Sequence, residues 1–369
     1  MTTIIRAASA ADFLSLIPHL AGYTPRRSVV LVPFHDRRTV GLLRFDLPPA
    51  RSDAFAATAI GTVCRIEDAD AVAIVVYTDD ALRDETGAPT GVDLIAALRG
   101  RAVACGLEIR DALVVARDGW RRDGAGPGDE GALTDIRQVR ATLPAPVASQ
   151  AAGTRLPRTG AQRRDAVRAA LIALEDTLVV LQRGGHGRRG AVDGADPEAL
   201  TALTALDETG VLWEELLEAD PATIEPHRLA LLLWSLALPG LRDVALAHWC
   251  HGPAAGRRAW DAQLQWEDDR TYPTEELFLA GEGPRPNPER LERALALVRH
   301  GAAATSGRYR AAALACAAWL SWALGRGTHA DAYARGAQRC DANHGLARIV
   351  RDLATAGHLP AWAFLAPAE

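Results

Sequence analysis

Two kinds of hydrophobic periodicity divide this sequence, and the division limits its fold more than any single motif does. Strand-like segments, such as 28–34 (SVVLVPF) and 71–77 (AVAIVVY), all lie before residue 117. From Arg163 onward, the apolar residues follow only the helical period of about 3.6 residues. The chain is therefore expected to combine strands with helices in its first part and to contain helices alone in the rest.

The first part alternates between strand-like and helix-like segments. A helix is expected over 10–20, and the segments 28–34 and 39–47, joined by a short polar tip, predict an antiparallel hairpin. The later alternation is typical of parallel βα units that cover both faces of a sheet. We expect a mixed sheet of the α+β or α/β class, in which two parallel strands extend the hairpin. The later elements are expected at 50–66 (helix), 71–77 (strand), 92–105 (helix) and 107–116 (strand).

The second part shows only helical periodicity. Proline in a first turn, as in Asn287-Pro288, and glycine after a last turn, as at Gly357, fit the expected helix ends. The tail resembles a tetratricopeptide-type helix pair, because small residues at Ala318, Ala330 and Ala337 would let two helices approach closely. An ordinary helical bundle is the alternative. The expected helices cover 163–182, 197–218, 224–238, 242–249, 288–300, 309–324, 329–340 and 344–356.

Three segments rich in polar residues, glycine or proline interrupt these elements, at 117–131, 142–160 and 183–197. We expect loops in all three, and a flexible loop at 183–197. The arginines of that third loop could alternatively contact an anion. The second break predicts two domains: a mixed α/β domain over 1–150 and an all-helical region over 160–369.

Charge and composition argue against several classes of function. The formal net charge of −5 disfavours broad, charge-driven binding to nucleic acid. The five cysteines are widely spaced and form no CxxC pair, which indicates reduced thiols in the cytosol. No segment reaches the roughly 18 uninterrupted apolar residues of a membrane span, and the N-terminus lacks a signal-peptide pattern. We therefore expect a cytoplasmic protein without membrane contact.

The common catalytic motifs are absent from the sequence. All 41 basic residues are arginine, so a Walker A loop, which requires lysine, is impossible. The sequence also lacks GxSxG, HExxH and a GxGxxG that follows a strand. The one local group of soft metal ligands is 248–251 (HWCH), but zinc needs about four ligands and no second pair stands out. We expect buried cysteine and half-exposed histidine there, and we assign no metal and no cofactor.

A resemblance to a known family rests on two motifs near the N-terminus and two helical segments. The segment 18–34 (PHLAGYTPRRSVVLVPF) and the later Arg44, Asp46, Leu47 and Pro48 resemble the opening of an actinobacterial family called domain of unknown function 4192. Segments 230–246 and 346–362 resemble its helical part. The family pattern continues with a tryptophan followed by cysteine; this chain keeps Trp120 but has no cysteine in the following loop. The resemblance supports the fold and implies no reaction.

One edge of the predicted sheet gathers polar residues. Ligands of βα units bind at the carboxyl ends of parallel strands, and three such ends should meet there, beside the amino end of the first, antiparallel strand. The hairpin tip with His35 and Asp36 should lie at the opposite edge. Carboxylates at strand ends could hold a divalent cation or a ribose hydroxyl, or simply cap helices or pair with Arg44. The expected edge residues are Tyr23, Arg26, Arg27, Ser28, Asp46, Asp79, Asp80, Arg117 and Asp118.

Tryptophans concentrate in the helical part, where most should lie in the core. Trp260 and Trp266 lie in a polar segment and are expected to form an exposed pair on a partner surface. Two functions follow. The favoured one is a non-catalytic interaction or regulatory protein whose helical region binds a protein partner. The alternative is a small-molecule or nucleotide-binding enzyme, with or without a metal ion, whose site lies at the strand ends. The sequence leaves enzyme status and oligomeric state open.

Overall fold

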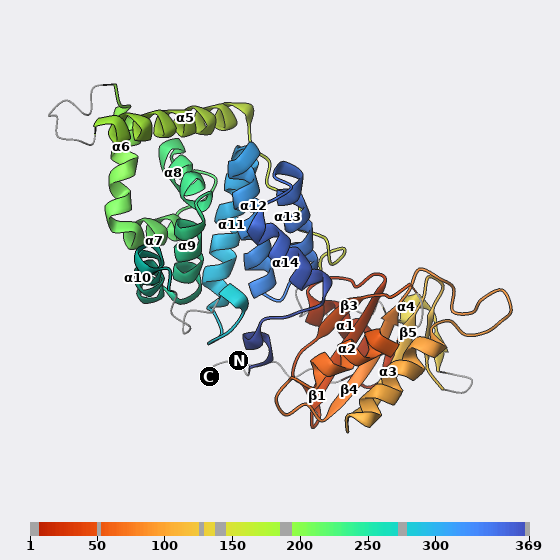
Figure 1. Cartoon of the computed structure of the whole chain (residues 1–369). Coiled ribbons are helices and arrows are strands. Elements are labelled where there is room, and N and C mark those ends of the chain that lie inside the picture. The colour runs from red at the N-terminus through yellow and green to blue at the C-terminus, as the bar shows by residue number, and fades with distance from the viewer. Residues whose placement is uncertain are drawn as a thin grey trace. The chain divides into compact units, whose positions relative to one another are not determined.

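The computed structural model describes residues 7–49, 53–124, 129–136, 145–184, 194–271 and 279–365. The chain forms two compact units (Figure 1). The N-terminal unit comprises Met1–Ala152 with Phe364–Glu369, and the helical unit comprises Gly153–Ala363. The first unit contains a mixed sheet and the second contains helices, so the predicted fold class is confirmed.

Three long strands form the centre of the sheet: β1 (Ser28–His35), β4 (Ala71–Tyr77) and β5 (Glu108–Val115). β1 pairs antiparallel with β4, and β4 pairs parallel with β5. The strand order is β2-β1-β4-β5-β6-β7, and β3 also pairs with β1. The short strands, which all pair antiparallel, are β2 (Arg38–Thr39), β3 (Leu43–Asp46), β6 (Trp120–Arg122) and β7 (Glu130–Gly131).

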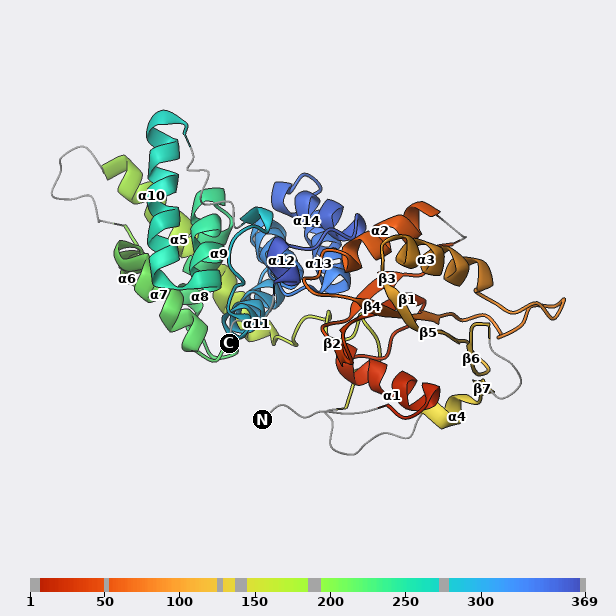
Figure 2. The same cartoon turned by 90° about the horizontal axis from the view of Figure 1, so that it is seen from below.

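Helices cover both faces of this sheet, which explains why β4 is buried along its whole length (Figure 2). On one face, α2 (Asp53–Val63) and α3 (Val92–Ala104) pack against side chains such as Ile74. On the other face, α1 (Ala10–Ala21) packs Leu14 and Ile17 against the sheet, and the short α4 (Leu133–Ile136) lies beside it.

Two sequence predictions for this unit were wrong. The segment 39–47 is not one strand: it forms the end of β2 and then β3, and the Thr39 hydroxyl donates to the Gly41 carbonyl (2.8 Å) in the interruption. The segment 117–131, predicted as a loop, contains β6 and β7. The polar and glycine-rich composition hid these strands, although Trp120 and Arg121 are buried there and pair with β5.

The helical unit is built from helices joined by short connections, and α12 (Gly307–Ala323) forms its centre. α12 is buried from Ala311 to Ala323 and packs against α8, α9, α11, α13 and α14. The other elements are α5 (Ala161–Gly184), α6 (Pro197–Thr204), η1 (Ala205–Glu208), α7 (Thr209–Glu218), α8 (Pro226–Leu236), α9 (Pro239–His251), α10 (Pro253–Asp269), α11 (Pro288–Ala304), α13 (Gly327–Cys340), α14 (Gly345–Thr355) and η3 (Ala361–Phe364).

Two further predictions are corrected in this unit. The expected helix 197–218 is broken into α6, the 3₁₀ turn η1 and α7. α10 was not predicted, because its second half is polar and gives no apolar stripe, although Pro253 occupies a favourable first-turn position. Of the predicted flexible loop 183–197, residues 185–193 lie outside the described residues.

Among the described residues, no single helix is long and apolar enough to meet the criteria for a membrane span. Only α8 and α9 taken together, with a bend of 107° between them, meet these criteria, and they do so by length and composition alone.

Candidate functional site

The sheet edge predicted from the sequence brings polar residues from four strands together. β3, β4 and β5 run in the same direction, antiparallel to β1. The register therefore places Ser28, at the amino end of β1, opposite Asp46 of β3 on one side and Tyr77 of β4 on the other. His35, at the far end of β1, lies at the opposite edge, where Phe34 faces Ala71.

The β3 side of this edge is occupied by an internal network. The Arg44 guanidinium donates to the hydroxyl of buried Ser28 (2.7 Å) and to the Asp46 carboxylate (2.5 Å). The Ser28 hydroxyl in turn donates to the Arg26 carbonyl (2.7 Å). The Arg44–Asp46 pair that the sequence offered as an alternative to a ligand site is therefore present.

The carboxylates that follow β4 and β5 each have neighbours within the chain. Asp118 accepts the Leu82 N–H (2.8 Å), and Asp80 accepts the Thr78 hydroxyl (2.9 Å). The Arg117 N–H donates to the Asp80 carbonyl (3.0 Å). Asp79, whose side chain is 76% exposed, lies 3.9 Å from Arg27. These interactions shape the loops at the edge and leave the Asp79 side chain exposed, as is that of Asp46 (89%).

The segment before β1 is held in place by residues 147–150, which belong to the predicted loop 142–160. The Gln150 side chain accepts the Arg26 N–H (3.2 Å) and donates to the Arg26 carbonyl (2.9 Å). The backbone of Tyr23 forms an isolated parallel β-bridge with Val147. Burial raises the pKa of the Tyr23 phenol, which Arg44 partly offsets. The nine predicted residues thus lie on one edge, and much of their hydrogen bonding holds that edge together.

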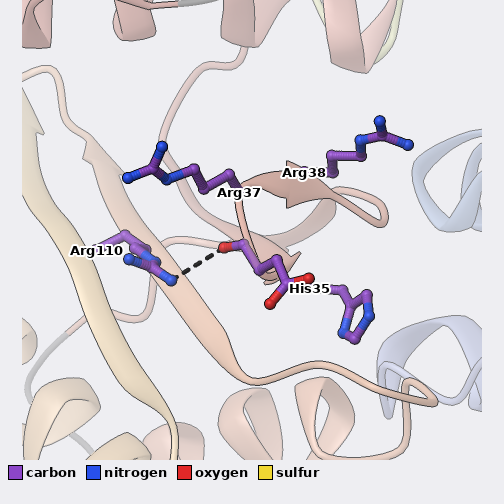
Figure 3. Close-up of a pocket in the computed structure, with 5 residues that line it drawn as sticks. His35, Arg37, Arg38 and Arg110 are labelled. Atoms are coloured by element: carbon purple, nitrogen blue, oxygen red, sulfur yellow. Dashed lines mark hydrogen bonds between the residues drawn. The ribbon is translucent and has the colours of Figure 1, made fainter.

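The hairpin tip forms an open cavity of about 610 Å³ (Figure 3). Arg110 donates to the Asp36 carbonyl (2.9 Å), and the Asp36 N–H donates to the Asp70 carboxylate (2.7 Å). The side chains of Arg37 and Arg38 extend in different directions in Figure 3. Because Asp36, Asp70 and Glu108 offset the arginines of this surface, it offers no strong net charge to an anion. The cavity is lined by His35, Asp36, Arg37, Arg38 and Arg110.

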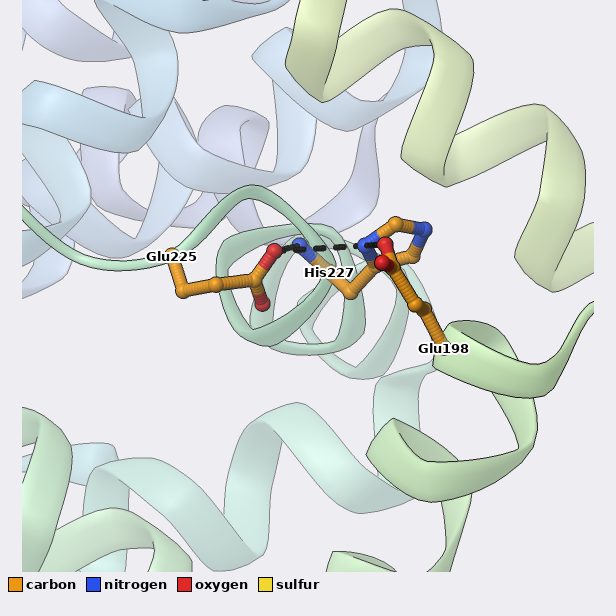
Figure 4. Close-up of side chains that lie close together, drawn as sticks. All are labelled: Glu198, Glu225 and His227. Carbon is orange, nitrogen blue, oxygen red and sulfur yellow. Dashed lines mark hydrogen bonds and ion pairs between the residues drawn. The ribbon is translucent and has the colours of Figure 1, made fainter.

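Glu198, Glu225 and His227 bring three possible metal ligands within 4.8 Å of one another (Figure 4). His227 Nδ1 lies 3.1 Å from Glu198 and 3.2 Å from Glu225. Two carboxylates and one imidazole form a donor set that zinc or manganese accepts. Glu225 also caps α8 by accepting the N–H groups of His227 and Arg228, which accounts for its position without a metal ion.

The HWCH segment belongs to the core. Cys250 is buried and His251 is half-buried, as expected, but His248 is only 1% exposed. Its Nε2 lies 2.6 Å from Glu214, and Arg290 donates two hydrogen bonds to the same carboxylate. Arg290 holds the pKa of Glu214 below its ordinary value, and burial lowers the pKa of His248. This network links α7, α9 and α11, and the HWCH residues form no group of three possible metal ligands with other described residues.

The partner surface proposed from the tryptophans is only partly exposed. Trp266 is 41% exposed near the end of α10, with the Arg270 guanidinium 5.9 Å from its ring centre. Leu264, in the same turn, is 49% exposed. Trp260 is half-buried and packs against the helical core, so it does not pair with Trp266 on an exposed surface as expected.

A groove of about 360 Å³ lies between α12 and α13 and was not predicted from the sequence. Its wall includes Leu314 and Tyr333, and the Tyr333 hydroxyl donates to the Gly153 carbonyl (3.3 Å). Arg310, Arg339 and Cys340 complete its polar surface. The lining residues are Thr154, Leu156, Ser306, Gly307, Arg310, Leu314, Ala332, Tyr333, Gly336, Arg339 and Cys340.

Comparison with known proteins identifies the family. The family described as a domain of unknown function (DUF4192) matches residues 11–272, more than half of the chain. This chain belongs to the DUF4192 family. No curated protein and no solved structure matched it. The DUF4192 match includes the sheet edge, the Glu198–Glu225–His227 cluster and the end of α10, whereas α12 and α13 follow it in the chain.

The cluster and the groove were missed for different reasons. Asp196-Pro197-Glu198 and Glu225-Pro226-His227 are both helix starts, and this repeated acidic-proline pattern is the signal from which the cluster could have been found. The groove combines 154–156 with residues about 150–180 positions later, and no local pattern in the sequence indicates that meeting.

Proposed function

We propose that this chain is a cytoplasmic, non-catalytic interaction or regulatory protein whose helical unit binds a partner protein. The observation that carries the proposal is the end of α10, where residues 264–268 are all exposed. Leu264 and Trp266 present large apolar side chains there. This part of the helix has no packing partner that would explain them within the described chain.

The composition of this helix end suits a protein interface. Tryptophan is enriched among the residues that contribute most to binding, and a polar rim commonly surrounds such residues. Here Gln265, Glu267 and Asp268 surround Trp266. The apolar area is small, so the interaction we propose is centred on one tryptophan and is not a permanent, core-like interface.

The test compares two single substitutions in the full chain. Trp266→Ala removes the proposed contact, and Ile172→Ala removes a similarly exposed apolar side chain (53%) from α5 of the same unit. The proteins recovered with each variant from an extract of the source organism are quantified against the unchanged chain. We expect at least one protein to be lost by Trp266→Ala and retained by Ile172→Ala. Equal recovery with all three chains contradicts the proposal.

A second candidate is a small-molecule or nucleotide-binding enzyme that uses the sheet edge. The observation that favours it is the convergence of Arg27, exposed Asp79 and the Ser28–Arg44–Asp46 network at one edge. Thermal unfolding with nucleotides, common metabolites and divalent cations tests it. A ligand at about 100 times its dissociation constant stabilises the folded state by roughly 2.7 kcal/mol. A stabilisation that Asp79→Ala or Asp46→Ala abolishes would support this candidate; stabilisation that survives both substitutions would exclude these carboxylates as its site.

A further inference from the structure

The groove between α12 and α13 combines an apolar wall with cationic groups that pair with no acidic side chain among the described residues. We propose that it binds a small carboxylate that carries an apolar body. This inference goes beyond the proposed function and does not depend on it, because the end of α10 contributes no residue to the groove. Three features of the groove lead to it: its unpaired charge, its helix end and its size.

The charge argument comes from the four arginines of α12 and α13. Two of them are paired: Arg308 with Glu175, and Arg335 with Asp331. The two that line the groove, Arg310 and Arg339, have no hydrogen-bond or ion-pair partner among the described residues. None of the lining residues is acidic. The two guanidiniums that lack an internal partner are thus the two that a ligand in the groove would meet.

The start of α12 adds backbone donors. Ser306 and Gly307 line the groove, and Ser306 makes no side-chain cap to the first turn of the helix. The first N–H groups of a helix have no partner within it and carry partial positive charge. A carboxylate near Arg310 can accept from these N–H groups as well as from the guanidinium, so the chemistry favours an anion over a neutral polar group.

Most of the remaining lining is apolar, so the ligand must carry an apolar group beside its carboxylate. Leu156, Leu314 and Ala332 form the wall with Tyr333, whose hydroxyl is held by Gly153. Gly336 contributes no side chain, and an added Cβ would lie 3.4 Å from Leu314. The volume of about 360 Å³ lies near the lower end of the roughly 300–1,000 Å³ of ligand pockets. The groove therefore suits a small amphipathic acid and is too small for a helix.

Cys340 provides a reporter inside the groove. Of the five cysteines, Cys64, Cys105 and Cys340 are exposed, and Cys340 alone lines the groove. In the full chain with Cys64→Ser and Cys105→Ser, alkylation of Cys340 is followed by mass spectrometry with octanoate, octanol or inorganic phosphate present. We expect octanoate to slow alkylation at least threefold with saturation, and octanol and phosphate to leave the rate within a factor of about 1.5.

Matched variants assign the effect to the two arginines. Arg310→Gln combined with Arg339→Gln should raise the octanoate concentration that gives half-protection at least tenfold. Arg335→Gln, which removes one charge from α13 outside the groove, should change it less than twofold. Calorimetric titration of the unchanged chain with octanoate and octanol provides a measurement that does not use the thiol. No binding of octanoate by calorimetry, equal protection by octanol, or equal protection in the double variant would each overturn the proposal.

Discussion

The two units of this chain fill their cores in opposite ways. The N-terminal unit buries branched aliphatic side chains of β1 and β4, such as Val30, Ile74 and Val75, between helices on both faces. The helical unit places an alanine-rich helix at its centre, and Ala311, Ala315 and Ala318 of α12 are fully buried. Large side chains leave cavities when they are shortened, whereas small side chains at helix contacts leave no room to grow. The same kind of core substitution should therefore affect the two units differently.

Polar groups differ between the units in a second way. At the sheet edge of the N-terminal unit, Asp46, Asp80 and Asp118 are already engaged with neighbouring groups of the chain. In the helical unit, Arg310 and Arg339 have no hydrogen-bond or ion-pair partner among the described residues, and Trp266 is exposed. This contrast is why we propose binding for the helical unit and a mainly structural role for most of the sheet-edge residues.

The largest expected effect is on the core of the sheet. Ile74 is fully buried in β4, so Ile74→Ala removes packed methyl groups and leaves a cavity. We expect a loss of about 2–5 kcal/mol in the free energy of unfolding of the N-terminal unit. Hydrogen exchange, followed on individual peptides by mass spectrometry, measures the stability of each unit separately. Equal loss of protection in both units would contradict the separation described here.

A smaller effect is expected from the buried network of the helical unit. Glu214→Ala leaves Arg290 and buried His248 without their shared acceptor, and the expected cost is about 2–3 kcal/mol. Glu215→Ala is the matched control, because the neighbouring Glu215 pairs with Arg228 at the surface, where such pairs contribute at most about 1 kcal/mol. Denaturant unfolding followed by tryptophan fluorescence measures both. Similar losses for the two variants would refute the structural role of the network.

Enlarging an alanine of α12 tests the close approach of helices directly. Ala318→Leu should destabilise the helical unit by about 1–3 kcal/mol, because the helices that pack on α12 must move to accept the larger side chain. The control is Ala254→Leu, at an exposed position of α10. The midpoint of thermal unfolding gives the comparison, and an unchanged midpoint for Ala318→Leu would show that this contact is loose.

Acidification should weaken the helical unit selectively. Burial lowers the pKa of His248, His300 and His344 from the ordinary 6.5, so the unfolded chain binds these protons more readily. The stability from these histidines is complete above pH 6.5 and decreases as the pH falls through that value. Protonation also removes the acceptor that His344 offers to the Ala347 N–H at the start of α14.

The N-terminal unit provides the internal reference for this prediction. Burial raises the pKa of half-buried Tyr23 and of buried Tyr77, which affects stability only at alkaline pH. Hydrogen exchange at pH 7 and pH 5.5, corrected for the intrinsic exchange rate, compares the units. A decrease in protection confined to the N-terminal unit would contradict the assignment.

The smallest effect on stability is expected at the proposed partner surface. Trp266→Ala removes an exposed side chain and should change the free energy of unfolding by no more than about 0.5 kcal/mol. Thermal unfolding checks this value. A much larger loss would mean that Trp266 supports the fold, and its use as a test of partner binding would then fail.

The sequence predicted the fold where periodicity was strong. Strand 71–77 matches β4, and the direction of the strands places Asp46, Asp79 and Asp118 at one edge, because strand polarity follows from short connections and βα alternation. The prediction failed where tertiary contacts override composition. Trp120 and Arg121 enter the sheet from a glycine-rich segment, and α10 forms although its second half is polar.

The site was harder to predict than the fold. Residue types could suggest the sheet edge as a site. Only the structure shows that the Asp118 carboxylate accepts the Leu82 N–H and that Arg44 donates to the Asp46 carboxylate. The ligand proposed for the groove depends on which arginines have an acidic neighbour in the folded chain. Arg308 pairs with Glu175 and Arg310 lines the groove, and the sequence alone does not reveal this difference between them.

Site-specific photo-crosslinking tests the central claim that binding belongs to the helical unit. Amine-reactive reagents are unsuitable because the chain contains no lysine. A photo-crosslinking residue is placed instead at Trp266 or, in a second chain, at Asp79 of the sheet edge, whose side chain is more exposed than that of Trp266. After irradiation in an extract of the source organism, we predict a discrete covalent complex from position 266 and none from position 79. A complex from position 79 alone would contradict the account and move the functional surface to the sheet.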